Sequence, residues 1–507
     1  MALTLESQTL AGDSMEFTAS SKALSDPIIL DIVLPLLNVP SLKAARLTCR
    51  QWCEIATPLL GQRTFLNGNK FDTFKATQQT DLVVDDQLLK RLYFSSAGHR
   101  NDFSLPYENW PNVIKRVISA IPQAAQLTRE LSIEIGNLNF VNTHFRGMES
   151  WNALNLKHVT VSVYMTCNMI PPFVGQVPLH NTLTSLKFKM DFRKGVWPGE
   201  YYFNQEILLP IWRAWLWSAP NLTSLEIEGT TCPNLISCDS LKVLKFRFEG
   251  IDDLVVALDL AAVTRMLEQV KGSLVHVELD YFTRGISTLQ RVGKLALPVM
   301  PNVVDLLAAD VYQILDLLNE HSLPNLKNLT LVNFFETPGL DYHPNFWTPH
   351  HGIQSLTLSL AGSTKCNQFA ATLVKLYPSV TKLDFTWKLF GLENLDLGLM
   401  EPFKLWNLNV ANVVMKQVCD SNIVIPVIRT ILNWKGVKTA KFYFYLNLTK
   451  SRFTGHLEEM IHFSDFFKTL EMGVCLDSEF VDQMRSIFEA RRAAINVKRV
   501  AVEEIFS

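Results

Sequence analysis

The chain has 507 residues, which at roughly 100 to 200 residues per domain suffices for several domains or for one long repeat array. Its content of 48% hydrophobic and 19% charged residues is typical of folded proteins and excludes extensive disorder. The formal net charge of −2 argues against a generally basic protein, because affinity for phosphate groups requires many uncompensated Lys and Arg side chains. We therefore expect no nucleic-acid partner and no membrane partner, with a local basic patch as the alternative.

Residues 1–23 carry acidic and hydroxyl side chains and lack the basic and apolar segments of a signal peptide. We expect a disordered leader there and a cytoplasmic or nuclear location. The eight cysteines are scattered without a C-x-x-C pair, so no zinc site or redox motif is predicted. No phosphate-binding glycine loop, G-x-S-x-G motif or H-E-x-x-H motif occurs, and we expect neither enzymatic activity nor a cofactor.

Residues 24–62 predict three short helices. Asp26 or Ser25 followed by Pro27 favours the start of a first helix that ends near Leu36. Ser41 is the expected N-cap of a second helix carrying Leu42, Ala45 and Leu47, and a third contains Trp52, Ile55 and Ala56. About forty residues cannot bury a self-sufficient core, so part of this apolar surface is expected to pack on something else.

This segment resembles the F-box. The matching positions are Leu24, Asp26, Ile28, Leu30, Ile32, Leu36, Leu42, Arg46, Cys49 and Trp52. Ser25, Pro27 and Thr48 depart from the usual Pro, acid and Val. The resemblance implies docking on the Skp-family adaptor of a cullin-RING ubiquitin ligase, through Pro27, Ile28, Ile32, Leu36, Leu42 and Trp52. An unrelated helical cap is the alternative.

After residue 127 one phrase, L-x-x-L-x-L with hydrophobic substitutes, recurs about thirteen times up to residue 507. Examples are LTSLKF (183–188), LTSLEI (222–227), LKNLTL (326–331), LWNLNV (405–410) and FKTLEM (467–472). The last two apolar residues of each phrase point inward from a short strand, because side chains alternate along a strand. Residues 252–270 and 367–377 have helical periodicity, so we expect helices there that connect the end of one strand to the start of the next. Residues 63–126 are expected to form a helical or capping connection.

One such unit cannot bury its own apolar face, so the units must stack into a parallel sheet with helices outside. The chain resembles the leucine-rich-repeat class of F-box proteins, which implies an α/β solenoid after a small all-α module. The Asn that usually follows L-x-x-L-x-L is absent. Chance apolar phrases in an ordinary α/β protein are the alternative.

The inward register identifies the residues that face outward. In four successive phrases the outward charges alternate in sign from one strand to the next, with Lys187 and Lys189, Glu226 and Glu228, Lys245 and Arg247, then Glu278 and Asp280. We predict two rows of cross-strand ion pairs whose charges cancel. Later outward positions are predicted to be neutral and polar, namely Asn328, Thr330, Ser355, Thr357, Ser359, Thr386, Asn407 and Asn409.

Because binding hot spots favour Trp, Tyr and Arg, the connecting loops are the expected target-binding region. The candidates are Arg193, Trp197, Tyr201 and Tyr202 in residues 191–202, and Phe335, Tyr342, Phe346 and Trp347 in residues 332–352. Packing of these aromatics within their own loops is the alternative. Taken together, the two resemblances imply the substrate-recognition subunit of an SCF-type ubiquitin ligase. It would hold a Skp-family adaptor, and through it a cullin, together with a target protein of unknown identity. The alternative is a protein-interaction scaffold without a ligase role.

Overall fold

The computed structural model describes residues 24, 26–68, 84–95, 121, 123–135, 154–164, 177–191, 209–229, 231–250, 258–283, 291–292, 295–310, 314, 317–332, 348–361, 367–388, 400–418, 424–444, 457–474, 478–491, 493 and 495–499. The chain divides into two compact units, Met1–Val159 and Thr160–Ser507. Sixteen of its strands form a parallel sheet in chain order, and a separate pair is made by β8 (Leu258–Asp259) and β10 (Arg291–Val292). The predicted α/β class is therefore confirmed, and the sheet is consistent with a repeat solenoid.

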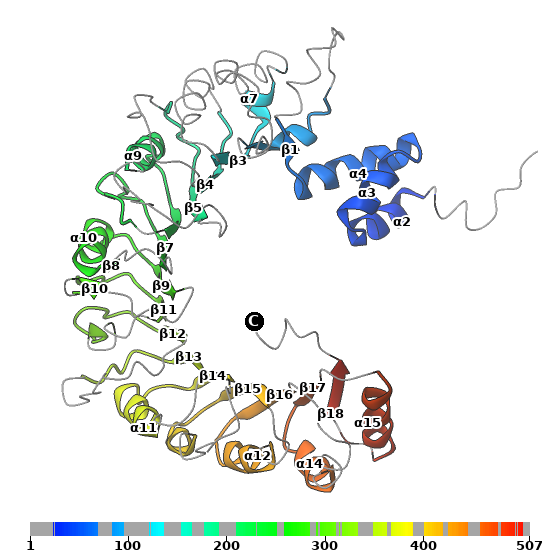
Figure 1. Cartoon of the computed structure of the whole chain (residues 1–507), viewed down its shortest axis with the longest axis vertical. Helices are drawn as coiled ribbons and strands as arrows, with labels where there is room; N and C mark the ends of the chain where they lie inside the picture. Colours follow the sequence, from blue (N-terminus) through cyan, green and yellow to red (C-terminus); the bar gives the residue numbers. More distant parts are fainter. Residues whose placement is uncertain are drawn as a thin grey trace, which may run out of the picture. The chain divides into compact units, whose positions relative to one another are not determined.

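The first unit begins with helices α2 (Pro27–Val33), α3 (Val39–Arg46) and α4 (Arg50–Arg63), with a 3-10 turn at Leu34–Leu36 (Figure 1). The Asp26 carboxylate accepts a hydrogen bond from the backbone amide of Ile28 at 2.8 Å and caps α2, as predicted. The cap of α3 is Asn38 instead of Ser41, because the Asn38 side chain accepts the Ser41 amide at 2.9 Å. Leu47 follows the last residue of α3 as its C-cap and is 85% exposed, so its predicted place within this helix is wrong.

The three helices share a small core in which Leu30, Leu34, Leu42, Ala45, Ala56 and Leu60 are buried. The Arg63 guanidinium donates a hydrogen bond to the Leu37 carbonyl at 2.7 Å and ties the end of α4 to the turn between α2 and α3. Gly61 lets α4 approach the following segment, since a Cβ there would lie 2.0 Å from the Gln87 carbonyl oxygen.

The same unit contributes strands β1 (Leu66–Asn67), β2 (Arg91–Ser95) and β3 (Glu130–Ile135), which pair in parallel. Strands β1 and β2 lie in residues 63–126, where helical or capping structure is expected from the sequence. The sequence LKRLYF (89–94) is itself an L-x-x-L-x-L phrase, and all three of its apolar positions are fully buried. The repeat pattern therefore begins earlier than residue 127. Strand β4 (His158–Tyr164) contains the division between the units.

In the second unit most of the predicted phrases coincide with strands. LTSLKF, for example, leads into β5, and its Leu183, Leu186 and Phe188 are at most 2% exposed. The strands are β5 (Ser185–Asp191), β6 (Ser224–Gly229), β7 (Val243–Gly250), β8 (Leu258–Asp259), β9 (His276–Thr283), β10 (Arg291–Val292), β11 (Asp305–Ala309), β12 (Asn328–Val332), β13 (Ser355–Ala361), β14 (Lys382–Lys388), β15 (Val410–Val418), β16 (Val437–Phe444), β17 (Thr469–Val474) and β18 (Ile495–Arg499).

The helices of the second unit lie on its outer side and the strands line its inner side (Figure 1). They are α9 (Leu209–Ser218), α10 (Leu260–Val270), α11 (Asn367–Leu376), α12 (Val424–Leu432), α14 (Leu457–Ser464) and α15 (Ser478–Ala490), with a 3-10 helix, η10 (Glu401–Leu405). Asp259 caps α10 by accepting the backbone amides of Ala261 and Ala262, so this helix starts eight residues later than predicted. Its Val263, Met266 and Leu267 are buried, as its periodicity predicts.

The predicted strand register is wrong for one phrase. In LWNLNV (405–410) Leu405 is 73% exposed, and the buried strand positions are Ala411, Val413 and Met415. The inward face of β15 is therefore set by LNVANV (408–413), three residues later. Asn407 and Asn409 precede the strand, and the outward residue paired with Asp384 of β14 is Asn412.

Candidate interaction surfaces

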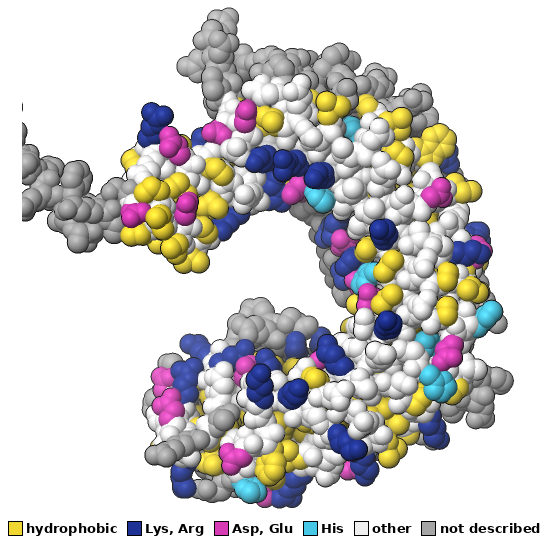
Figure 2. Space-filling model, turned by 180° about the vertical axis from the view of Figure 1, so that it is seen from behind, with side chains coloured by type: hydrophobic (Ala, Val, Ile, Leu, Met, Phe, Trp, Pro, Cys, Tyr) yellow, Lys and Arg dark blue, Asp and Glu magenta, His cyan; other side chains and the backbone are white. Residues whose placement is uncertain are grey.

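The first candidate surface is an apolar face on α2 and the 3-10 turn after it. Ile28, Ile32 and Leu36 are 71%, 63% and 81% exposed, and Pro27 beside them is also exposed. Figure 2 shows hydrophobic side chains gathered at this end of the first unit. Exposed apolar residues that are contiguous, in contrast to single ones, mark sites of protein association. This apolar face thus keeps four of the six predicted adaptor-binding residues accessible.

The other two predicted adaptor-binding residues have structural roles. Leu42 is fully buried in the core of the three helices, so its prediction as a docking residue is wrong. Trp52 packs partly against the same core, and its indole Nε1 donates a hydrogen bond to the Leu24 carbonyl at 2.8 Å. Sequence reasoning missed further large apolar side chains exposed in this segment, which are Leu24, Ile29, Val33 and Leu47. The apolar residues of α2 occur on more than one side of the helix, and that pattern was the available signal.

The second candidate surface is the outward face of β5, β6, β7 and β9. Strand register places Lys187 opposite Glu226, Lys245 between Glu226 and Glu278, and Glu228 in the neighbouring row. The Lys187 Nζ lies 2.5 Å from a Glu226 carboxylate oxygen and 3.2 Å from one of Glu228. Lys189–Glu228, Lys245–Glu278 and Arg247–Asp280 form further pairs at 3.2, 2.7 and 2.6 Å. The predicted rows of alternating ion pairs are confirmed, and we call them the charge ladder.

The ladder shifts the pKa values of its members. Burial opposes the charge of Glu228, but attraction to Lys187 and Lys189 outweighs it and lowers the pKa of this carboxyl. A hydrogen bond from His276, reinforced by Lys245, lowers the pKa of Glu278 to about 2. Both carboxylates therefore stay charged at neutral pH, and the surface they share with the lysines is electrically balanced.

Reversing the charge of Lys187 should destabilise the second unit. The Lys187→Glu variant places a third carboxylate beside Glu226 and the largely buried Glu228. We expect a loss of about 1–2 kcal/mol in the free energy of unfolding, measured by urea denaturation, because an attractive cross-strand pair becomes repulsive. The double variant Lys187→Glu, Glu226→Lys should recover part of the loss. An unchanged unfolding midpoint in Lys187→Glu would contradict a stabilising ladder.

Beyond β9 the outward residues become mostly neutral. Asn328, Thr330, Ser355, Thr357, Ser359 and Thr386 occupy the predicted outward strand positions. Charged residues also occupy outward positions on these strands. The Asn328 side-chain amide donates a hydrogen bond to the Asp305 carboxylate at 2.5 Å, and Lys382 pairs with Asp384 at 3.2 Å.

The predicted target-binding residues lie outside the described residues. This holds for all eight, Arg193, Trp197, Tyr201, Tyr202, Phe335, Tyr342, Phe346 and Trp347. The surrounding strands β5, β12 and β13 are described, but the loops that carry these aromatics are not.

The geometry is that of an α/β protein with a 16-stranded parallel sheet, which is consistent with a repeat solenoid. No protein-family model matches the chain, and no curated protein matches it significantly. Within the described ranges no helix is long and apolar enough to cross a membrane. Among the same residues no group of three or more His, Cys, Asp or Glu side chains is placed to hold a metal ion.

Proposed function

We propose that this protein is the substrate-recognition subunit of an SCF-type ubiquitin ligase, built on leucine-rich repeats. The F-box-like segment of residues 24–62 binds a Skp-family adaptor, and the repeats hold a target protein. The protein contributes proximity in place of catalytic groups, because joining target and ligase in one complex raises their effective concentration.

The observation that carries the proposal is the exposed apolar face of α2. Burying a large aliphatic side chain stabilises a complex by roughly 1.5–3 kcal/mol, and this face presents Ile28, Ile32 and Leu36 together. The core that supports it uses different residues of the same segment, Leu30 and Leu34. An exposed apolar surface on a folded support is what adaptor docking requires.

The proposal is tested by co-purification of the full-length chain with a Skp-family adaptor. The double variant Ile32→Glu, Leu36→Glu should lower adaptor affinity at least about tenfold, because two apolar contacts are replaced by charges. Its thermal unfolding should match that of the unmodified protein, since both side chains are exposed. Ile236→Glu is the matched control, because Ile236 is 69% exposed in the second unit.

Adaptor binding that survives the double variant would contradict docking through this face. No adaptor bound to the full-length protein would reject the ligase role. The repeats would then support the alternative function, a protein-interaction scaffold. Deleting residues 1–62 should remove adaptor binding while binding to the target is retained.

A further inference from the structure

The last five strands of the second unit have a different charge pattern from the charge ladder. In the charge ladder four basic and four acidic residues balance. Across β14 to β18 the described outward positions carry five lysines and two acids, an excess of three positive charges. These residues are Lys382, Lys388, Lys416, Lys441 and Lys498, with Asp384 and Glu471. Figure 2 shows basic side chains on the inner side of the carboxyl-terminal repeats.

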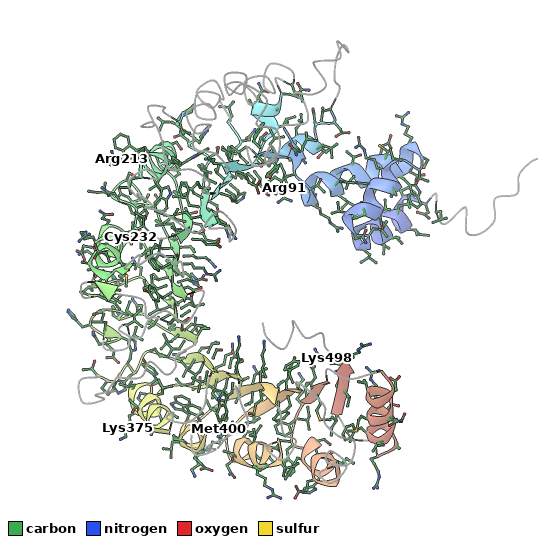
Figure 3. The ribbon with its side chains drawn as sticks, in the orientation of Figure 1. Arg91, Arg213, Cys232, Lys375, Met400 and Lys498 are labelled. Atoms are coloured by element: carbon green, nitrogen blue, oxygen red, sulfur yellow. The ribbon has the colours of Figure 1, made fainter. Side chains whose placement is uncertain are left out.

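Three of the lysines lie toward the carboxyl ends of their strands. Lys388 of β14 is in register with Lys416 of β15, and Lys498 of β18 is in register with Gly473 of β17, which is opposite Tyr443 of β16. A register shift between Met415 and Val418 of β15 separates the first pair from the second group. Lys498 lies on the inner side of the sheet at β18 (Figure 3). We call Lys388, Lys416, Tyr443 and Lys498 the lysine row.

Among the described residues, one carboxylate lies beside this row. Glu471 is largely buried and contacts Lys498 at 3.1 Å, Lys441 at 3.7 Å and the Tyr443 hydroxyl at 3.2 Å. It is thus shared among three groups. Both the Lys441 and the Lys498 side chains remain about a third exposed, so they can still accept an external anion.

Lys388 and Lys416, the two lysines at the β14 end of the row, repel each other electrostatically. Burial, together with the positive charge of Lys388, lowers the pKa of the Lys416 ammonium. Among the described residues no carboxylate forms an ion pair with Lys416. An anion placed between Lys388 and Lys416 would relieve their repulsion, and the gain in free energy would favour its binding.

From this arrangement we infer that the lysine row binds an acidic peptide segment in an extended conformation. Four strand spacings of about 4.8 Å separate Lys388 from Lys498, so the row is roughly 19 Å long. An extended peptide of about six residues, at roughly 3.3 Å per residue, spans this length and can meet the lysines with separate carboxylates. A single small anion cannot reach both ends.

This inference names the chemistry of the target and in that sense rests on the proposed function. It has its own readout, because binding of a peptide to the repeats requires no adaptor. The two proposals can therefore fail separately.

The test uses the full-length chain and a fluorescein-labelled peptide of alternating Glu and Ser, about eight residues long, in a fluorescence anisotropy titration at about 50 mM salt. The same peptide with Gln in place of Glu should bind at least about tenfold more weakly. Added salt should lower the affinity of the protein for the acidic peptide. The double variant Lys388→Gln, Lys416→Gln should lose about tenfold in affinity for the acidic peptide.

The matched control is Lys327→Gln, Lys375→Gln, which removes two exposed lysines away from the row. Lys375 lies on α11 at the outer side of the unit (Figure 3). This control should keep the affinity of the unmodified protein, and both double variants should keep adaptor binding and thermal stability. Equal binding of the Glu and Gln peptides, or equal affinity of the two double variants, would overturn the inference. Tighter binding of inorganic tripolyphosphate or duplex DNA than of the acidic peptide would also overturn it.

Discussion

Replacing Phe403 by alanine should lower the free energy of unfolding of the carboxyl-terminal repeats by about 3–5 kcal/mol. Phe403 lies on η10 and is fully buried. Its ring stacks on Trp406 with centroids 5.0 Å apart and meets the rings of Trp434 and Phe385 edge-on at 5.4 and 5.7 Å. Truncation removes the centre of this aromatic cluster and leaves a cavity that its three large aromatic neighbours cannot readily fill.

The anchoring of the neighbours makes the effect large. The indole Nε1 of Trp406 donates to the Tyr377 carbonyl at 2.8 Å, and that of Trp434 donates to the Met400 carbonyl at 3.1 Å. Each indole would have to break a buried hydrogen bond to move into the cavity. Trp fluorescence during urea denaturation, together with hydrogen exchange of β14 and β15, measures the loss. Phe403→Leu is the control and should lose much less, since most of the volume is kept. A Phe403→Ala protein within about 1 kcal/mol of the unmodified one would contradict the described packing.

Gly436→Ala should destabilise the turn before β16 by about 2–4 kcal/mol. Gly436 has a φ of +72°, a conformation that costs an alanine free energy because its Cβ crowds the backbone. An added Cβ would also lie 2.3 Å from the Leu408 carbonyl oxygen. The Gly436 carbonyl accepts the Ala411 amide at 2.9 Å, so a shift of this turn would disturb the first contact between β15 and β16.

Gly272→Ala provides the matched comparison. An added Cβ at Gly272 meets no atom within 4 Å, so its stability should stay the same or rise slightly. Thermal unfolding of both variants measures the difference. Equal melting temperatures for Gly436→Ala and Gly272→Ala would show that the strained turn does not limit stability.

Much of the repeat region could be predicted because each strand is specified by a short stretch of its own sequence. Each phrase places two apolar residues on one face of a short strand, and the alternation then identifies the outward neighbours. That reasoning was sufficient for the partners of Lys187 and Lys245 in the charge ladder. It failed at residues 405–410, where Leu405 and Leu408 produce a plausible phrase, but η10 delays the strand by three residues. It also missed LKRLYF (89–94), which stands well before the regularly spaced phrases that follow residue 127.

The lysine row could not be predicted in the same way. Lys388 and Lys416 are 28 residues apart in the sequence, and a bulge shifts the register between β15 and β16 at Met415. Whether these lysines meet acids or one another depends on which strands are neighbours and on how each pair is aligned.

Most strands of the repeats, the alternation of inward and outward residues along them, and the three helices of residues 24–62 follow from the sequence. Which apolar residues of those helices stay accessible depends on how the helices pack. In α2 and the 3-10 turn after it, Leu30 and Leu34 recur at a spacing of four, and so do Ile28, Ile32 and Leu36. Both sets satisfy helical periodicity, so local spacing cannot distinguish them. The structure separates them because α3 and α4 cover Leu30 and Leu34, whereas no described neighbour covers the other side.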